Sequence, residues 1–183
     1  MRLSPVLADD DLSPAELQAA RLDGEVYDLA GAYCLIGELE APGHRARAVL
    51  GTRSPRLIAE LRTAAWVWGA AAEPVRLEFA VTPDARARLS PAEQATVREI
   101  VYEEGDVVDL DGVRVTTPLR TILDLARFAE PFDPESVVRL AAIAGLGLDD
   151  CLTALAGRPG IPAKHRARGN LRAAYAVETR YTS

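Results

Sequence analysis

The feature that most constrains this fold is a short strand pair that leads directly into a proline-started helix, within residues 107–128. Apolar residues alternate on both sides of Asp111-Gly112, and Asp-Gly between such runs is the strongest short signal for a β-hairpin. Thr117 can then cap a helix whose first turn Pro118 presets. The sequence therefore predicts a β-hairpin that feeds a helix with one apolar face.

Helix and strand signals alternate along the rest of the chain. Ser13 opens a capping box with Glu16, which predicts a helix over residues 15–22. A β-hairpin over residues 26–36 follows it. The other expected elements are helices over 44–50, 56–68, 118–128, 133–144, 148–156 and 164–177, strands over 75–82 and 97–102, and a helix start at Ser90. This order predicts an α+β fold with a helical C-terminal layer.

The charge of the chain is unevenly distributed. The net charge of −6 is not typical of a nucleic-acid-binding domain. Residues 44–62 nevertheless carry five Arg against one Glu, and residues 158–183 carry six Arg or Lys against one Glu. Residues 99–111 carry six acidic groups and no basic one. We interpret the acidic stretch as one protected sheet edge rather than a contact to a basic partner. The basic C-terminal stretch is either a solvated helix face or a contact to nucleic acid or an acidic partner.

The same sequence offers little for catalysis or for a membrane. No apolar run reaches the roughly 18–20 residues that cross a bilayer, and no signal-peptide pattern opens the sequence, so we expect a cytoplasmic protein. Cys34 and Cys151 match no metal or redox spacing, and we expect reduced, partly buried thiols, a disulfide between them being the alternative. His44 and His165 lie among arginines and are expected to be solvated. We predict no catalytic residue, metal or cofactor.

Residues 111–127 resemble the signature of the AbiEi-like antitoxin family. In that family a strand reading roughly G-V-x-V-T-S-P runs into a helix reading A-R-T-x-x-D-L-A; here Thr117 replaces serine and Leu119 replaces alanine. Residues 63–69 and 75–82 resemble the family's upstream segments, so the resemblance covers about residues 45–175. The motif positions are Thr117, Pro118, Arg120, Thr121 and Asp124.

We interpret these motif residues as organisers of the strand–helix junction, direct contact with a partner being the alternative. Arg120 and Asp124 are one helical turn apart. Residues at this spacing can form an ion pair, which contributes about 0.2–0.5 kcal/mol if it is exposed.

The resemblance implies an N-terminal winged helix that binds operator DNA and a remainder that counteracts a nucleotidyltransferase-type toxin. We therefore expect a degenerate winged-helix part over residues 1–40 and an AbiEi-like α+β domain over residues 41–183. The winged-helix part lacks an arginine cluster, and phosphate neutralisation dominates DNA affinity, so its DNA binding should be weak. The candidate DNA-contacting residues are Gln18, Arg21, Arg45, Arg47, Lys164, Arg166 and Arg168.

The sequence thus predicts a non-enzymatic, antitoxin-like bacterial regulator that acts by protein binding, with weak DNA binding and autoregulation as a secondary role. The alternatives are a transcriptional repressor without a toxin and a stand-alone interaction scaffold or small-molecule sensor. Some relatives end in a Vsr-like nuclease domain, which needs an acidic residue two positions before a lysine. Pro162 occupies that position before Lys164, the sole lysine, so we expect no nuclease.

Overall fold

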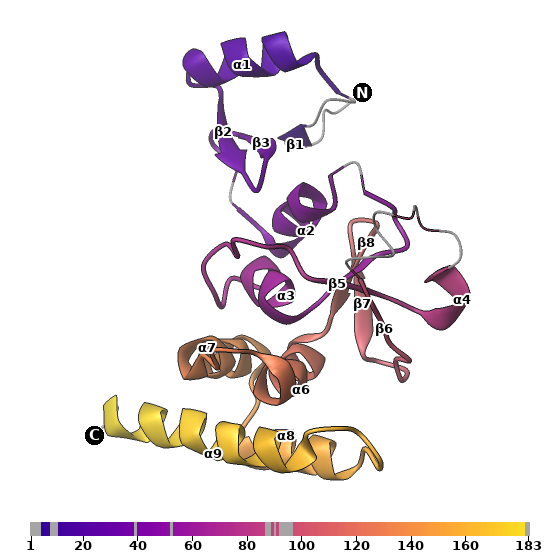
Figure 1. Cartoon of the computed structure of the whole chain (residues 1–183). Helices are drawn as coiled ribbons and strands as arrows, with labels where there is room; N and C mark the ends of the chain where they lie inside the picture. Colours follow the sequence, from indigo (N-terminus) through magenta and orange to yellow (C-terminus); the bar gives the residue numbers. More distant parts are fainter. Residues whose placement is uncertain are drawn as a thin grey trace.

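A small N-terminal sheet, a larger mixed sheet and a layer of helices follow one another along the chain and through the molecule (Figure 1). The computed structural model describes residues 5–7, 11–38, 40–51, 53–86, 89, 91 and 97–181. The helix start predicted at Ser90 lies outside these residues.

The N-terminal sheet is packed between two helices. Its strands are β1 (Val6–Leu7), β2 (Val26–Leu29) and β3 (Ala32–Leu35), in the antiparallel order β1-β3-β2. Helix α1 (Pro14–Leu22) buries Leu17 against one face, in a small core of its own. Residues on the other face join the larger core beneath α2 (Pro42–Leu50). The helix and hairpin predicted for this part are confirmed, whereas its division from the rest near residue 40 stays a prediction.

The larger sheet has the strand order β6-β5-β4-β8-β7. Strands β4 and β8 are parallel, as are β5 and β6, while the other neighbours are antiparallel. Helix α3 (Leu61–Val67) follows β4 directly, and the short α4 (Pro83–Arg86) follows β5. The strands are β4 (Ile58–Ala59), β5 (Phe79–Val81), β6 (Arg98–Glu99), β7 (Val107–Leu110) and β8 (Val113–Thr116).

The helical layer follows the sheet and surrounds a second core. Helix α6 packs against α3 on one side and against α7 and α9 on the other. Figure 1 shows α9 at the end of the molecule opposite the N-terminal sheet. The helices are α6 (Pro118–Phe128), α7 (Pro134–Ala144), α8 (Leu148–Ala156) and α9 (Lys164–Tyr181). The α+β class and its helical C-terminal layer are therefore confirmed.

The hairpin and helix starts appear where local signals placed them. Strands β7 and β8 pair around Asp111 and Gly112, whose φ angles of 54° and 84° are both positive, as the mirror-image hairpin turns require. Thr117 caps α6, and Asp133 caps α7. Short polar side chains at these positions accept hydrogen bonds from the first helical N–H groups, which is why the signals hold.

One predicted helix and one predicted surface are wrong. Residues 56–68 form β4 and then α3 rather than a single helix, because a short buried strand and a buried helix show similar apolar spacing. The acidic stretch does not form one sheet edge, since β6 and β7 lie at opposite ends of the sheet. Glu99 lies on one edge strand and Asp109 on the other, while Asp106 is buried.

Two cysteines are buried and one histidine is half-buried. Cys34 and Cys151 are free and buried, and they lie in different cores. His44 is half-buried rather than solvated, and its Nδ1 has no hydrogen-bond partner in the described part of the chain. Among the described helices, we find none with the length and apolarity needed to cross a bilayer.

We predict that Leu171→Ala lowers the free energy of unfolding by about 2–5 kcal/mol. Leu171 on α9 is fully buried in the second core, so its truncation leaves a cavity between the helices. The matched control is Leu22→Ala, because Leu22 is 86% exposed and its replacement should change stability by about 0.5 kcal/mol or less. Urea unfolding measures both, and equal effects would show that α9 is not part of the folded core.

Candidate functional site

The junction between β8 and α6 is fastened by threonine hydroxyl groups. The Thr117 N–H donates to Asp106 O at 2.9 Å, and the Thr117 hydroxyl accepts weakly from the Arg120 N–H at 3.5 Å. The Thr121 hydroxyl lies 2.9 Å from Thr117 O and 3.1 Å from Thr116 O. These contacts fix the direction in which α6 leaves the sheet.

A chain of buried ion pairs starts from this junction. Arg120 donates from Nε to Asp124 at 2.8 Å and from Nη1 to Asp106 at 2.7 Å. Arg127 donates to the second oxygen of Asp124 at 2.9 Å, and Arg158 donates to both oxygens of Asp106. Asp124 is completely buried, so the Arg120–Asp124 pair is not the exposed, weak pair considered from sequence alone. We call these five residues the ion chain.

A third buried carboxylate, outside the ion chain, lies beside it. Glu60, between β4 and α3, accepts from Arg98 at 2.7 Å and 2.5 Å on its two oxygens. Burial raises the pKa of Glu60 against the opposing effect of Arg98. A buried carboxyl group with a raised pKa is a candidate for acid–base chemistry. Here, however, both oxygens are held by the guanidinium group, which leaves no free oxygen facing a substrate.

Aromatic rings support the same guanidinium groups. Arg120 lies 4.7 Å from the centre of the Tyr102 ring, and Arg98 and Arg127 lie 4.8 Å and 4.3 Å from that of Phe128. Cations over aromatic faces are attracted by the ring quadrupole. Of the residues that form the ion chain and surround it, only Arg120 and Asp124 were selected from the sequence. Arg127 could have been found from its spacing to Asp124, whereas the other partners come from distant segments.

The candidate DNA-contacting residues of the N-terminal half lie on α1 and α2. Gln18 donates to the Tyr33 hydroxyl at 2.8 Å, and Arg21 lies exposed in the last turn of α1. Arg45 pairs with Glu40 and approaches Val67 O at 3.4 Å, whereas Arg47 is exposed on α2.

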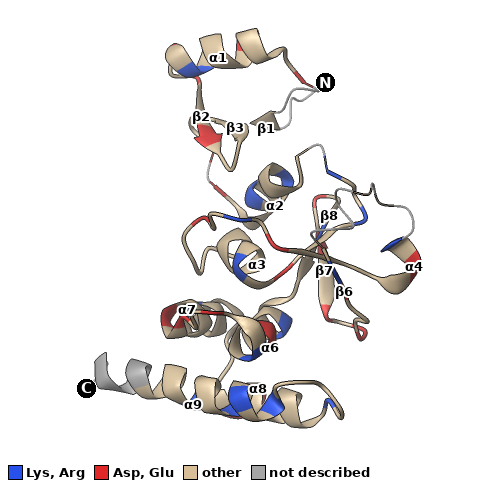
Figure 2. Cartoon of the chain, in the orientation of Figure 1, with Lys and Arg blue, Asp and Glu red and all other residues tan. Residues whose placement is uncertain are grey.

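The candidates of the C-terminal half lie on α9, and two of them are engaged. Lys164 donates to Ala156 O at 3.0 Å and so caps the end of α8. Arg166 pairs with Glu130 at 2.6 Å, and Arg168 is exposed. Figure 2 shows α1 and α9 at opposite ends of the molecule, so the candidates do not form one basic face.

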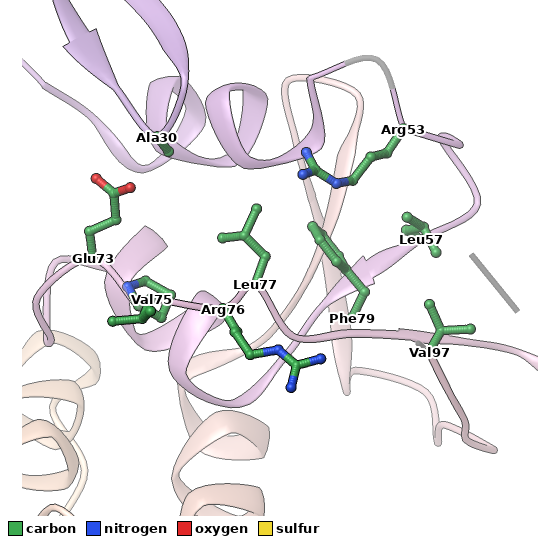
Figure 3. Close-up of a pocket in the computed structure, with 10 residues that line it drawn as sticks. Ala30, Arg53, Leu57, Glu73, Val75, Arg76, Leu77, Phe79 and Val97 are labelled. Carbon is green, nitrogen blue, oxygen red and sulfur yellow. The ribbon is translucent and has the colours of Figure 1, made fainter. Parts of the chain in front are cut away.

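A hollow beside the segment that leads into β5 is lined by both parts of the chain. It has a volume of about 430 Å³ and is lined by residues 30, 53, 57, 73–77, 79 and 97. Figure 3 shows the side chains of Leu77 and Phe79 pointing to one side of this segment, while Arg76 points to the other. The Arg53 guanidinium lies 5.9 Å from the centre of the Phe79 ring. We call this space the Arg53 hollow.

A larger groove shares residues 74–77 and 79 with the Arg53 hollow. Its volume is about 660 Å³, and it is lined by residues 60–62, 74–79, 98, 130, 131 and 133. Arg62 spans it, because its backbone N–H donates to Glu78 at 2.8 Å and its guanidinium donates to Glu130 O at 2.7 Å. We call it the Arg98 groove. The segment 73–79 therefore borders two open spaces, whereas the motif residues Arg120, Thr121 and Asp124 are buried.

The acidic side chains of this region are engaged within the chain. Within the described residues, no group of three or more His, Cys, Asp or Glu side chains is placed to hold a metal ion. The clustered carboxylates at positions 60, 106 and 124 are each paired with arginine. An ion pair fixes the orientation of a carboxylate and occupies part of its acceptor capacity, so these groups are less available to a substrate than free carboxylates.

We predict that Arg120→Met lowers the free energy of unfolding by about 3–5 kcal/mol, because it leaves buried carboxylates without their cation. Arg120 contacts both Asp106 and Asp124. The matched control is Arg139→Met, which removes an exposed pair with Glu135 and should cost about 0.2–0.5 kcal/mol. Chemical unfolding at neutral pH measures both changes, and a loss for Arg120→Met no larger than for the control would contradict the buried ion chain.

We also predict a loss of stability on acidification that depends on Asp106. Burial alone would raise its pKa, but hydrogen bonds from Arg158, the Glu103 N–H and Arg120 outweigh burial and hold the pKa below its usual value. A carboxyl group with a lowered folded-state pKa contributes stability above its unfolded pKa of about 3.9, and this is lost as the pH falls through the folded-state pKa.

Asp106→Asn should therefore be less stable at neutral pH and show a shallower stability loss below about pH 4. Unfolding curves collected at several pH values measure the slope. The exposed Asp149→Asn variant on α8 serves as the control and should keep the wild-type slope. If Asp106→Asn lost stability with falling pH as steeply as the wild type, Asp106 would not be the group responsible for that loss.

Comparison with known proteins agrees with the resemblance seen in the sequence. The chain matches the model of the AbiEi antitoxin C-terminal domain over residues 57–172. Among solved structures it is similar to the RV2827C protein from Mycobacterium tuberculosis, with 18% identity and a TM-score of 0.45, over 93% of this chain and 72% of that chain. No curated protein matches the sequence significantly. Since the family match spans more than half of the sequence, the chain belongs to the AbiEi antitoxin family.

Proposed function

We propose that this chain is a non-catalytic antitoxin that acts by binding a partner protein, a nucleotidyltransferase-type toxin. The observation that carries the proposal is the ion chain within the family domain, where the motif residues Arg120 and Asp124 neutralise each other and their neighbours. Their role is to hold the domain in shape. The surface, including the Arg98 groove, is then what a partner meets.

The charge of the N-terminal part supports protein binding over DNA binding. Between residues 5 and 38 the described acidic residues are Asp11, Glu16, Asp23, Glu25, Asp28 and Glu38, against the single basic residue Arg21. Phosphates would be repelled by such a surface, and DNA affinity depends chiefly on phosphate neutralisation. DNA binding and autoregulation are therefore secondary in this proposal.

Co-expression with a nucleotidyltransferase-type toxin of the kind that AbiEi-like antitoxins counteract tests the proposal. We expect the toxin alone to arrest growth, the pair to grow, and the two proteins to elute together on size exclusion. The control is the destabilised Leu171→Ala variant, in which the buried core side chain is lost and rescue should weaken at higher temperature. Unrelieved toxicity together with separate elution of a folded chain would refute a toxin-binding role.

A repressor acting without a toxin is the second candidate, and the exposed Arg168 and Arg172 on α9 favour it. Gel-shift experiments against its own promoter at several salt concentrations discriminate the two. A sequence-specific shift near physiological salt that Arg168→Glu abolishes would support the repressor. If binding is lost at that salt and is independent of sequence, only non-specific attraction to phosphate is present.

A further inference from the structure

Carboxylates lining the Arg98 groove already have their hydrogen-bond donors. Glu60 is held by Arg98 at 2.5 Å and 2.7 Å, and Glu78 accepts from the backbone N–H of Arg62 at 2.8 Å. Glu130 pairs with Arg166 at 2.6 Å. Asp133 caps α7 by accepting from the Glu135 N–H at 3.1 Å. Each of these carboxylates therefore already accepts at least one hydrogen bond from within the chain.

The groove still offers unused donors. Arg76 is exposed, and the described part of the chain provides no partner for its guanidinium group. Figure 3 shows that it points away from Leu77 and Phe79. Arg98 spends Nε and Nη2 on Glu60, and its side chain remains 36% exposed. An arginine fork presents its donors in the geometry of a carboxylate, so these groups favour an acidic ligand.

Apolar surface lies next to these donors. Val75 is fully exposed, at 105% of its reference area, directly before Arg76. The buried side chains of Leu61 and Phe79 also line the groove. An isolated exposed valine is ordinary, but one that borders an open groove beside an unpaired arginine matches the apolar–polar mixture of a binding surface.

The groove is unsuited to a nucleic-acid backbone. Four of its lining residues, Glu60, Glu78, Glu130 and Asp133, are acidic, and two of its three arginines, Arg62 and Arg98, already pair with Glu78 and Glu60. Arg76 offers a single cation, whereas a nucleic-acid backbone needs a run of them. A peptide can instead place a carboxylate at one point and an apolar side chain at the next. We propose that the Arg98 groove docks a segment of a partner protein in which one acidic side chain stands next to an apolar one, so that the carboxylate meets Arg76 and the apolar side chain meets Val75. This inference rests on the proposed function and specifies the part of the partner that is recognised.

The test uses the ¹⁵N-labelled full chain and an acetylated hexapeptide with one glutamate beside one leucine, its other positions being glycine and serine. Saturable amide shifts are expected for residues 75–79 and for Glu130 and Asp133, which line the groove. Arg76→Glu should weaken this binding at least about fivefold, because it replaces the free cation by an anion. The matched control, Arg139→Glu, changes an exposed arginine of α7 outside the groove and should bind like the wild type.

Three results would overturn the proposal. They are equal binding of the peptide with lysine in place of glutamate, amide shifts confined to another surface, and a stronger response of the same amides to a ten-nucleotide oligothymidine. The peptide experiment needs no toxin, so it fails or succeeds independently of the co-expression result. If a toxin binds the Arg76→Glu variant as tightly as it binds the wild type, the groove is not the docking site, although the toxin-binding role still stands.

Discussion

The buried ion chain is the constraint on which the rest of the structure depends. Asp106 joins Arg120 of α6 to Arg158, which follows α8, and Asp124 joins Arg120 to Arg127. Removing these charges from water is costly, and the attraction between them offsets that cost only while every partner is in place. The ion chain therefore acts chiefly by penalising other arrangements of the helical layer on the sheet.

Features specified by neighbouring residues could be predicted from the sequence. Asp111-Gly112 determines the hairpin turn because its positive φ angles are tolerated by these residue types. Ser13 and Thr117 place helix starts because their hydroxyl groups accept from the first free N–H groups. Such signals act within four residues and need no knowledge of the rest of the fold, which explains why both helices begin where expected.

Features made by distant residues could not be predicted in the same way. Asp106 was expected on an acidic sheet edge, yet Arg158, 52 positions later, neutralises it. Lys164 and Arg166 looked like free cations, yet they hold backbone carbonyl groups of Ala156 and Ala129 within the helical layer. The net charge of a segment does not show which of its charged groups are already paired. The basic surface of the C-terminal half was therefore overestimated from the sequence.

The same pairing makes the few unpaired groups informative. Arg62 bridges Glu78 to the backbone of Glu130, so the position of the helical layer also sets the shape of the Arg98 groove. Because the neighbouring carboxylates are satisfied within the chain, Arg76 is the donor that a ligand can take without breaking an internal ion pair. Because the ion chain pairs the buried charges, recognition of a partner should depend on exposed, unpaired groups such as Arg76. The family motif then serves recognition indirectly, by fixing the scaffold that presents these groups.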